Sequence, residues 1–253
     1  DALLHQAKRM RFRHLALTDH NALYGAVAFY RKAVEVGIRP IIGSEITLTD
    51  DTNLILLAKD KTGYQHLCQL LSCGHLNGGH LNFRLTPKEL IKYRQGLFIL
   101  SGGQKGKIWQ LLKNKQVDQA ARYCREMKRI YGNSFYLELQ HFTHNDTLLN
   151  IRLRDLGHQY RIPIVATNDV HMLTPKAWTL RRTLHAIDQN TLYDKIDSAG
   201  YDTQYLRSAR EMQEIFKNFP EAIQNTEIIA GQCNFEFKLG KSIFPKIELP
   251  ENE

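Results

Sequence analysis

Short apolar strands alternate with helices of ten or more residues along most of this chain. A predicted opening helix at 1–10 is followed by a strand at 14–18, a helix at 22–37 that ends at Gly37, and a strand at 40–48. Strands that are separated by helices favour right-handed crossovers and a mainly parallel sheet. The strands predicted in this way are residues 14–18, 40–48, 53–59, 96–103, 134–140 and 162–171. Six such strands favour an α/β fold with barrel-like closure.

Two helix starts can be placed from capping chemistry. Thr62 is the predicted N-cap of a helix over residues 62–74, because a threonine hydroxyl can accept from the free amides of the first turn. A short helix is predicted to begin near Thr86 and Pro87, since proline is favoured in the first turn.

The last quarter of the chain changes character. Residues 207–233 read as two helices broken at Phe219 and Pro220, because proline disrupts a helix interior. The proline-bearing tail that follows resembles an extended linker, so a further domain is expected after it. We therefore predict a barrel over residues 1–207 and a helical exit with a linker over residues 208–253.

Composition limits the class of partner and the location. The 34 Lys and Arg residues exceed the 26 Asp and Glu residues, giving a net charge of +8, which favours an anionic partner such as nucleic acid. Two basic segments, at 8–14 and 102–107, either form solvent-exposed charged surfaces or contact such a partner. Apolar runs are strand-sized and far shorter than the roughly 20 residues of a membrane span, and the four cysteines are scattered. We expect a cytoplasmic protein that does not interact with membranes.

Carboxylates and imidazoles follow several of the predicted strands. Asp19 and His20 follow the strand at 14–18, Glu45 lies near the end of the next strand, and Asp169 and His171 end the strand at 162–171. In a parallel barrel the carboxyl ends of the strands form one rim. Such side chains at one rim are suitable ligands for divalent ions. Each residue taken singly is equally well explained as a turn or capping residue.

The order and spacing of these motifs resemble a known family. The segments are "HLALTDHNALYGAVAFYRKAVEVGIRPIIGSEI", "LILLAKDKTGYQHLCQLLS", "SFYLELQ" and "IPIVATNDVHML". They are similar to the PHP (polymerase and histidinol phosphatase) domain of bacterial C-family DNA polymerases, the family of the polymerase III alpha subunit and its error-prone relatives. The resemblance implies a distorted (βα)7 TIM-like barrel with zinc or manganese ions at its rim.

The resemblance also implies which residues bind metal. Four positions match the ligands of the family: His20, Glu45, Asp169 and His171. Three further ligands would belong to a first strand, which we expect to precede Asp1 because the chain opens inside a predicted helix.

Two positions depart from the ligand pattern of the family. Asn53 stands where the family has a histidine, and Gly103 stands where it usually has a cysteine. An amide oxygen is a weak zinc ligand and glycine has no side chain, so we expect a degenerate site with partial or absent metal occupancy. Asp19 and His141 are possible contributors from a second layer around the ligands.

Three functions are compatible with these features. The leading one is a PHP domain that supports DNA replication structurally, through contact with the polymerase core of its own chain and possible docking of a proofreading exonuclease, with DNA nearby. The second is a metal-dependent phosphoesterase, either a 3′-5′ exonuclease or a pyrophosphatase. The third is a free-standing PHP phosphatase. The polymerase carboxylates themselves are expected downstream of Glu253, so polymerase activity is not expected from this segment alone.

Overall fold

The fold is organised around one six-stranded sheet. The computed structural model describes residues 1–78, 82–196 and 200–240. Its strands are β1 (His14–His20), β2 (Arg39–Thr47), β3 (Asn53–Ala58), β4 (Leu97–Leu100), β5 (Phe135–Leu139) and β6 (Ile164–Ala166). They are hydrogen-bonded in chain order. The predicted α/β class and the six strands are confirmed, and β4 and β6 are shorter than predicted.

Five of the six strands run in the same direction, as expected for a mainly parallel sheet, and β3 is the exception. It is antiparallel to both β2 and β4, because a short turn at residues 48–52 joins β2 directly to β3. This hairpin places Thr47 opposite Asn53 and Glu45 opposite Ile55. The hairpin therefore brings two of the predicted site positions, Glu45 and Asn53, to the same end of this strand pair.

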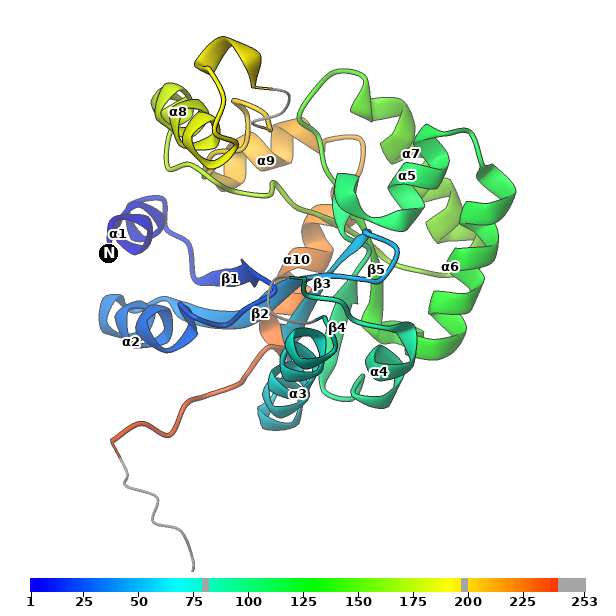
Figure 1. Cartoon of the computed structure of the whole chain (residues 1–253), viewed down its shortest axis with the longest axis horizontal. Coiled ribbons are helices and arrows are strands. Elements are labelled where there is room, and N and C mark those ends of the chain that lie inside the picture. The colour runs from blue at the N-terminus through cyan, green and yellow to red at the C-terminus, as the bar shows by residue number, and fades with distance from the viewer. Residues whose placement is uncertain (79–81, 197–199, 241–253) are drawn as a thin grey trace, which may run out of the picture.

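Ten α-helices connect and cover the strands in the described part of the chain. They are α1 (Ala2–Arg9), α2 (Ala26–Val36), α3 (Lys61–Asn77), α4 (Pro87–Lys92), α5 (Lys107–Lys113), α6 (Val117–Tyr131), α7 (Asp146–Tyr160), α8 (Trp178–Asp188), α9 (Ala209–Ile215) and α10 (Pro220–Gln232). Figure 1 shows α5, α6 and α7 together on one side of the sheet, with α8 and α9 beyond its upper edge.

The capping predictions have mixed outcomes. Thr62 is not the N-cap of α3: Asp60 is, and its carboxylate accepts a hydrogen bond from Gly63 N at 2.9 Å. Aspartate, two residues earlier, satisfies the same free amides that the threonine was expected to satisfy. The start of α4 is confirmed, with Thr86 in a capping box with Glu89, and α10 begins at Pro220 as predicted. Helix α5 was not predicted.

The sheet is apolar on both faces, and helices pack against each face. Side chains on one face, including Leu56, Ile99 and Leu137, pack in the largest core cluster with residues of α3, α5, α6 and α7. Alternate side chains on the other face form a second group with α10. This group consists of Ile41, Leu57, Phe98, Leu100, Tyr136, Val165, Ile229 and Cys233. Helix α10, drawn in orange in Figure 1, thus packs against this second face of the sheet.

Helix α10 joins the C-terminal segment to the sheet. Its Asn225 Nδ2 donates to Ile164 O of β6 at 2.8 Å, and Ile229 is 4% exposed. The division into residues 1–207 and 208–253 stays a prediction, and the expected linker falls largely at 241–253, outside the described residues.

No helix in the described ranges is long and apolar enough to cross a membrane.

The two neighbouring isoleucines of α10 test how much this packing contributes. Ile229→Ala should lower the free energy of unfolding by about 3 kcal/mol, since it removes buried methyl groups and leaves a cavity. Ile228, which is 48% exposed, is the matched control, and Ile228→Ala should cost about 0.5 kcal/mol or less. Urea unfolding of both variants measures the difference. Equal effects would contradict the packing of α10 as described.

Candidate functional site

The hairpin between β2 and β3 positions the first carboxylate of the candidate site. Glu45 lies near the end of β2, with its side chain 12% exposed. Asn53, the first residue of β3, is buried, and its Nδ2 donates to Glu45 Oε1 at 2.6 Å. Asn53 therefore presents a hydrogen-bond donor to Glu45, whereas a metal ligand would present an acceptor.

A lysine side chain lies between the two carboxylates that were predicted as ligands. Lys105 ends a short 3₁₀ turn, Gly103–Lys105, which follows β4. Its Nζ donates to Glu45 Oε1 at 3.1 Å and lies 4.0 Å from Asp169 Oδ2. The chain thus places its own cation at this point of the rim.

Asp169 follows β6 and is held on both of its oxygens. His171 Nε2 lies 3.1 Å from Oδ1, and Gln204 Nε2 donates to Oδ2 at 2.8 Å. Arg181 in turn donates to Gln204 Oε1 at 2.8 Å. Burial raises the pKa of Asp169, but His171, Lys105 and Arg181 outweigh it and leave that pKa below its ordinary value.

His20 lies beside Glu45 in the register of β1 and β2 but is bonded elsewhere. Its Nε2 is 3.0 Å from Thr47 Oγ1. Asp19 Oδ2 accepts from Gly25 N at 2.9 Å, just before α2, so its carboxylate stabilises the start of that helix. His141 is partly buried, and burial lowers its pKa.

The side chain of Gln140, which directly follows β5, occupies the space beside Gly103. Gly103 has φ +52°, and a Cβ built there would lie 2.2 Å from Gln140 Cδ. Gln140 Oε1 accepts from Gln104 N at 2.9 Å. A side chain at position 103 would have to displace Gln140, so the amide of Gln140 lies where a ligand from position 103 would need space.

One buried carboxyl group near these residues was not singled out by sequence reasoning. Glu138 of β5 is 3% exposed. Its Oε1 accepts from Thr167 Oγ1, and its Oε2 has no hydrogen-bond partner among the described residues. Burial, with smaller contributions from the negative charges of Asp169 and Glu45, raises its pKa to about 7. One signal was available: Glu138 is an acidic residue in the middle of the apolar strand "FYLEL".

The predicted residues are therefore only partly brought together. Glu45, Asn53 and Asp169 converge around Lys105, with His171 bound to Asp169. Within the described ranges, no group of three or more His, Cys, Asp or Glu side chains is arranged to hold a metal ion. The predicted ligands have hydrogen-bond donors of the chain itself against their oxygens, so the residues in this arrangement do not fit a bound metal ion.

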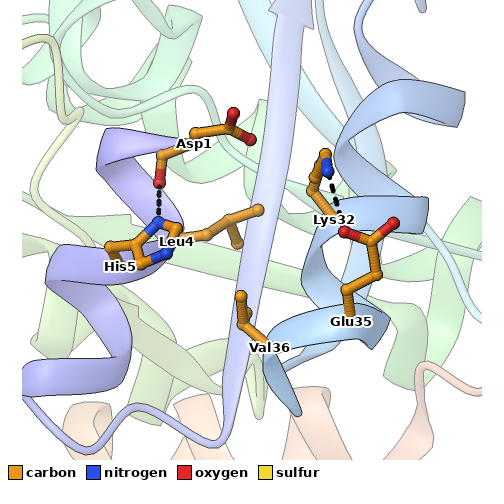
Figure 2. Close-up of a pocket in the computed structure, with 6 residues that line it drawn as sticks. All are labelled: Asp1, Leu4, His5, Lys32, Glu35 and Val36. Atoms are coloured by element: carbon orange, nitrogen blue, oxygen red, sulfur yellow. Dashed lines mark hydrogen bonds and ion pairs between the residues drawn. The ribbon is translucent and has the colours of Figure 1, made fainter.

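A surface pocket of about 340 Å³ lies elsewhere, between α1 and α2. Figure 2 shows the residues that line it: Asp1, Leu4, His5, Lys32, Glu35 and Val36. Their polar contacts are local, with His5 Nδ1 bonded to Asp1 O at 2.9 Å and Lys32 paired with Glu35 at 2.8 Å. None of the predicted site residues lines this pocket.

A family model described as "PHP domain" matches residues 1–142, more than half of the chain. The chain belongs to the PHP domain family. The family resemblance inferred from the motifs is thereby confirmed.

Relatives of the PHP chain are bacterial polymerases. DNA polymerase III subunit alpha of Bacillus subtilis is 34% identical, over 99% of this chain and 23% of the relative. The subunit of the same name from Vibrio cholerae is 36% identical, over 91% of this chain and 21% of the relative. The error-prone DNA polymerase of Symbiobacterium thermophilum is 35% identical, over 99% and 25%. The chain thus spans about a quarter or less of the length of these relatives.

One solved structure with a similar arrangement is that of a protein from Bifidobacterium adolescentis, provisionally assigned as a metal-dependent phosphoesterase. The similarity covers 85% of this chain and 89% of that one, at 12% identity and a TM-score of 0.48.

The pKa of Glu138 predicts a specific pH dependence of stability. The pKa of this carboxyl group is about 7 in the folded protein, against an ordinary value of 4.5. Below about pH 4.5 the group therefore does not lower the free energy of unfolding, and it lowers that free energy increasingly as the pH rises toward and through 7. Glu138→Gln removes this titration. Between about pH 4.5 and pH 8 the wild-type protein should therefore lose on the order of 3 kcal/mol of unfolding free energy relative to Glu138→Gln. Urea unfolding across this pH range measures the loss.

The matched control is Glu227→Gln, at an exposed position of α10. It should keep the wild-type pH dependence. A difference between wild type and Glu138→Gln that does not change with pH would contradict the assignment.

Proposed function

We propose that this chain is the PHP domain of a bacterial C-family DNA polymerase, either the alpha subunit of DNA polymerase III or its error-prone relative, and that it supports DNA replication mainly by structure. The proposal rests on similarity that runs through nearly the whole chain yet covers only 21% to 25% of three such polymerases. A chain of this extent supplies one domain of such an enzyme.

The metal site of this domain is degenerate in the proposal. The observation that carries this statement is the set of donors on the two predicted carboxylate ligands. Asn53 and Lys105 donate to Glu45, and Gln204 donates to Asp169. Nitrogen donors stabilise carboxylates without a metal ion. Zinc or manganese would be held by His20, Glu45, Asp169 and His171, with partial or absent occupancy.

The complete fold in this proposal is a distorted (βα)7 barrel of PHP type. In the described part of the chain, β1 and β6 lie at the two ends of the strand order and do not pair with each other. A further strand, preceding β1 in the sequence of the complete protein, would pair between these edges.

The partners in this proposal are those of a replicative or error-prone polymerase in the cytoplasm. The main one is the polymerase core of the same chain, which the similarity to much longer relatives supports. A proofreading exonuclease is a second partner, and the net charge of +8 is compatible with nearby DNA.

Metal analysis combined with a hydrolysis assay tests the degenerate site. The purified protein should contain far less than one equivalent of zinc or manganese, and should not hydrolyse a generic phosphodiester, since the ligand oxygens are already bonded within the chain. Stoichiometric metal, with turnover that is lost in Asp169→Ala, would instead overturn the degenerate site and support a metal-dependent phosphoesterase.

A structural role is tested by the heat inactivation of polymerase activity in the full-length protein. Ile229→Ala should lower the temperature at which polymerisation is lost by about 6 to 12 °C, because it destabilises this domain by about 3 kcal/mol. Ile228→Ala is the control and should leave that temperature close to the wild-type value. Loss of polymerisation at the same temperature in all three proteins would contradict a supporting role.

A further inference from the structure

Three carboxyl groups lie close enough to interact at the rim of the sheet. Glu45 and Asp169 both raise the pKa of the buried Glu138 through their negative charge. Their side chains are 12% and 25% exposed. Carboxylates that lie this close together and are largely shielded from water need a compensating cation.

Lys105 carries a cationic group that lies against two of these carboxylates. Its Nζ bonds Glu45 Oε1 at 3.1 Å and lies 4.0 Å from Asp169 Oδ2. The two carboxylates come from β2 and from the segment after β6, so the ammonium group bridges two elements that are far apart in the strand order. Arg181 also acts on Asp169, but it does so through the amide of Gln204.

We infer that the Lys105 ammonium group is a tethered substitute for a divalent cation, which neutralises Glu45 and Asp169 and keeps metal out of the site. The inference rests on the degenerate site proposed above and explains how two largely shielded carboxylates, Glu45 and Asp169, are stabilised close together. A lysine ammonium is a compact point charge with three donors and a flexible stem, so it can occupy the space between two carboxylates from separate elements.

The backbone around Lys105 keeps its side chain near the rim. Gly102 and Gly103 have φ of +82° and +52°, and Gly102 approaches the backbone of Asn53 so closely that a Cβ built on it would lie 1.9 Å from Asn53 O. Glycine is needed where the backbone adopts this conformation at such close range. The turn that carries Lys105 is therefore packed directly against the strand that carries Asn53.

The test is a titration of the full-length protein with Mn²⁺, in which electron paramagnetic resonance measures the free ion. Lys105→Met should bind one more Mn²⁺ per chain than the wild-type protein, with an affinity at least about tenfold higher at that site. Lys105→Arg keeps the charge and should behave like the wild-type protein. In Lys105→Met/Asp169→Asn the additional ion should be lost, which assigns it to this site.

Lys107→Met is the matched control. Lys107 lies two residues away and also forms an ion pair, with Asp50 at 2.7 Å, so the same change in net charge is made outside the site. It should bind no additional Mn²⁺. An equal gain in Lys105→Met and Lys107→Met would overturn the inference, because the effect would then come from net charge alone.

The remaining outcomes separate this inference from the proposed function. If the wild-type protein lacks metal and Lys105→Met gains none, the substitution of lysine for metal is overturned while the degenerate site stands. If the wild-type protein already binds one ion that Asp169→Asn removes, the degenerate site itself is overturned. If Lys105→Met does not fold, Lys105→Gln, which keeps hydrogen-bonding capacity, is titrated in its place with the same criteria.

Discussion

Carboxylates at the rim of an apolar sheet have to be neutralised or protonated, and this requirement governs the candidate site. Glu45 is bonded by Asn53 and Lys105, and Asp169 is bonded by His171 and Gln204. Glu138 is instead stabilised by protonation, since burial raises its pKa to about 7. Each of these contacts uses a lone pair that a metal ion would otherwise need. Hydrogen bonds and one ammonium group of the chain itself therefore stabilise these carboxylates.

The same sheet depends on α10 for the burial of its second face. Strand residues alternate between the two faces, and helices α3 to α7 leave apolar side chains such as Phe98 and Val165 on the other side. Ile229 of α10 and Cys233, which directly follows α10, pack against these residues. The C-terminal helices thus contribute to the stability of the sheet that carries the site, which links the two units predicted from the sequence.

Local patterns predicted much of the architecture. Apolar runs bounded by helices placed all six strands, and the capping box at Thr86 and the proline at 220 placed two helix starts. The same reasoning was wrong for Thr62, because Asp60 is also a good cap and local propensity does not choose between them. It also missed α5, whose seven residues are too few for a clear periodic pattern.

The motifs in the sequence by themselves determined the family and the residue types at the rim. The reason is that the order and spacing of the strand ends along the chain can be read directly from the sequence. Only the tertiary structure decided what those residues contact. Lys105 lies 60 residues from Glu45 in the chain, and Gln140 fills the space beside Gly103. Such contacts depend on how the strands are ordered, on the reversed direction of β3 and on the turn after β4, and no local pattern encodes which lysine reaches a carboxylate that distant in sequence.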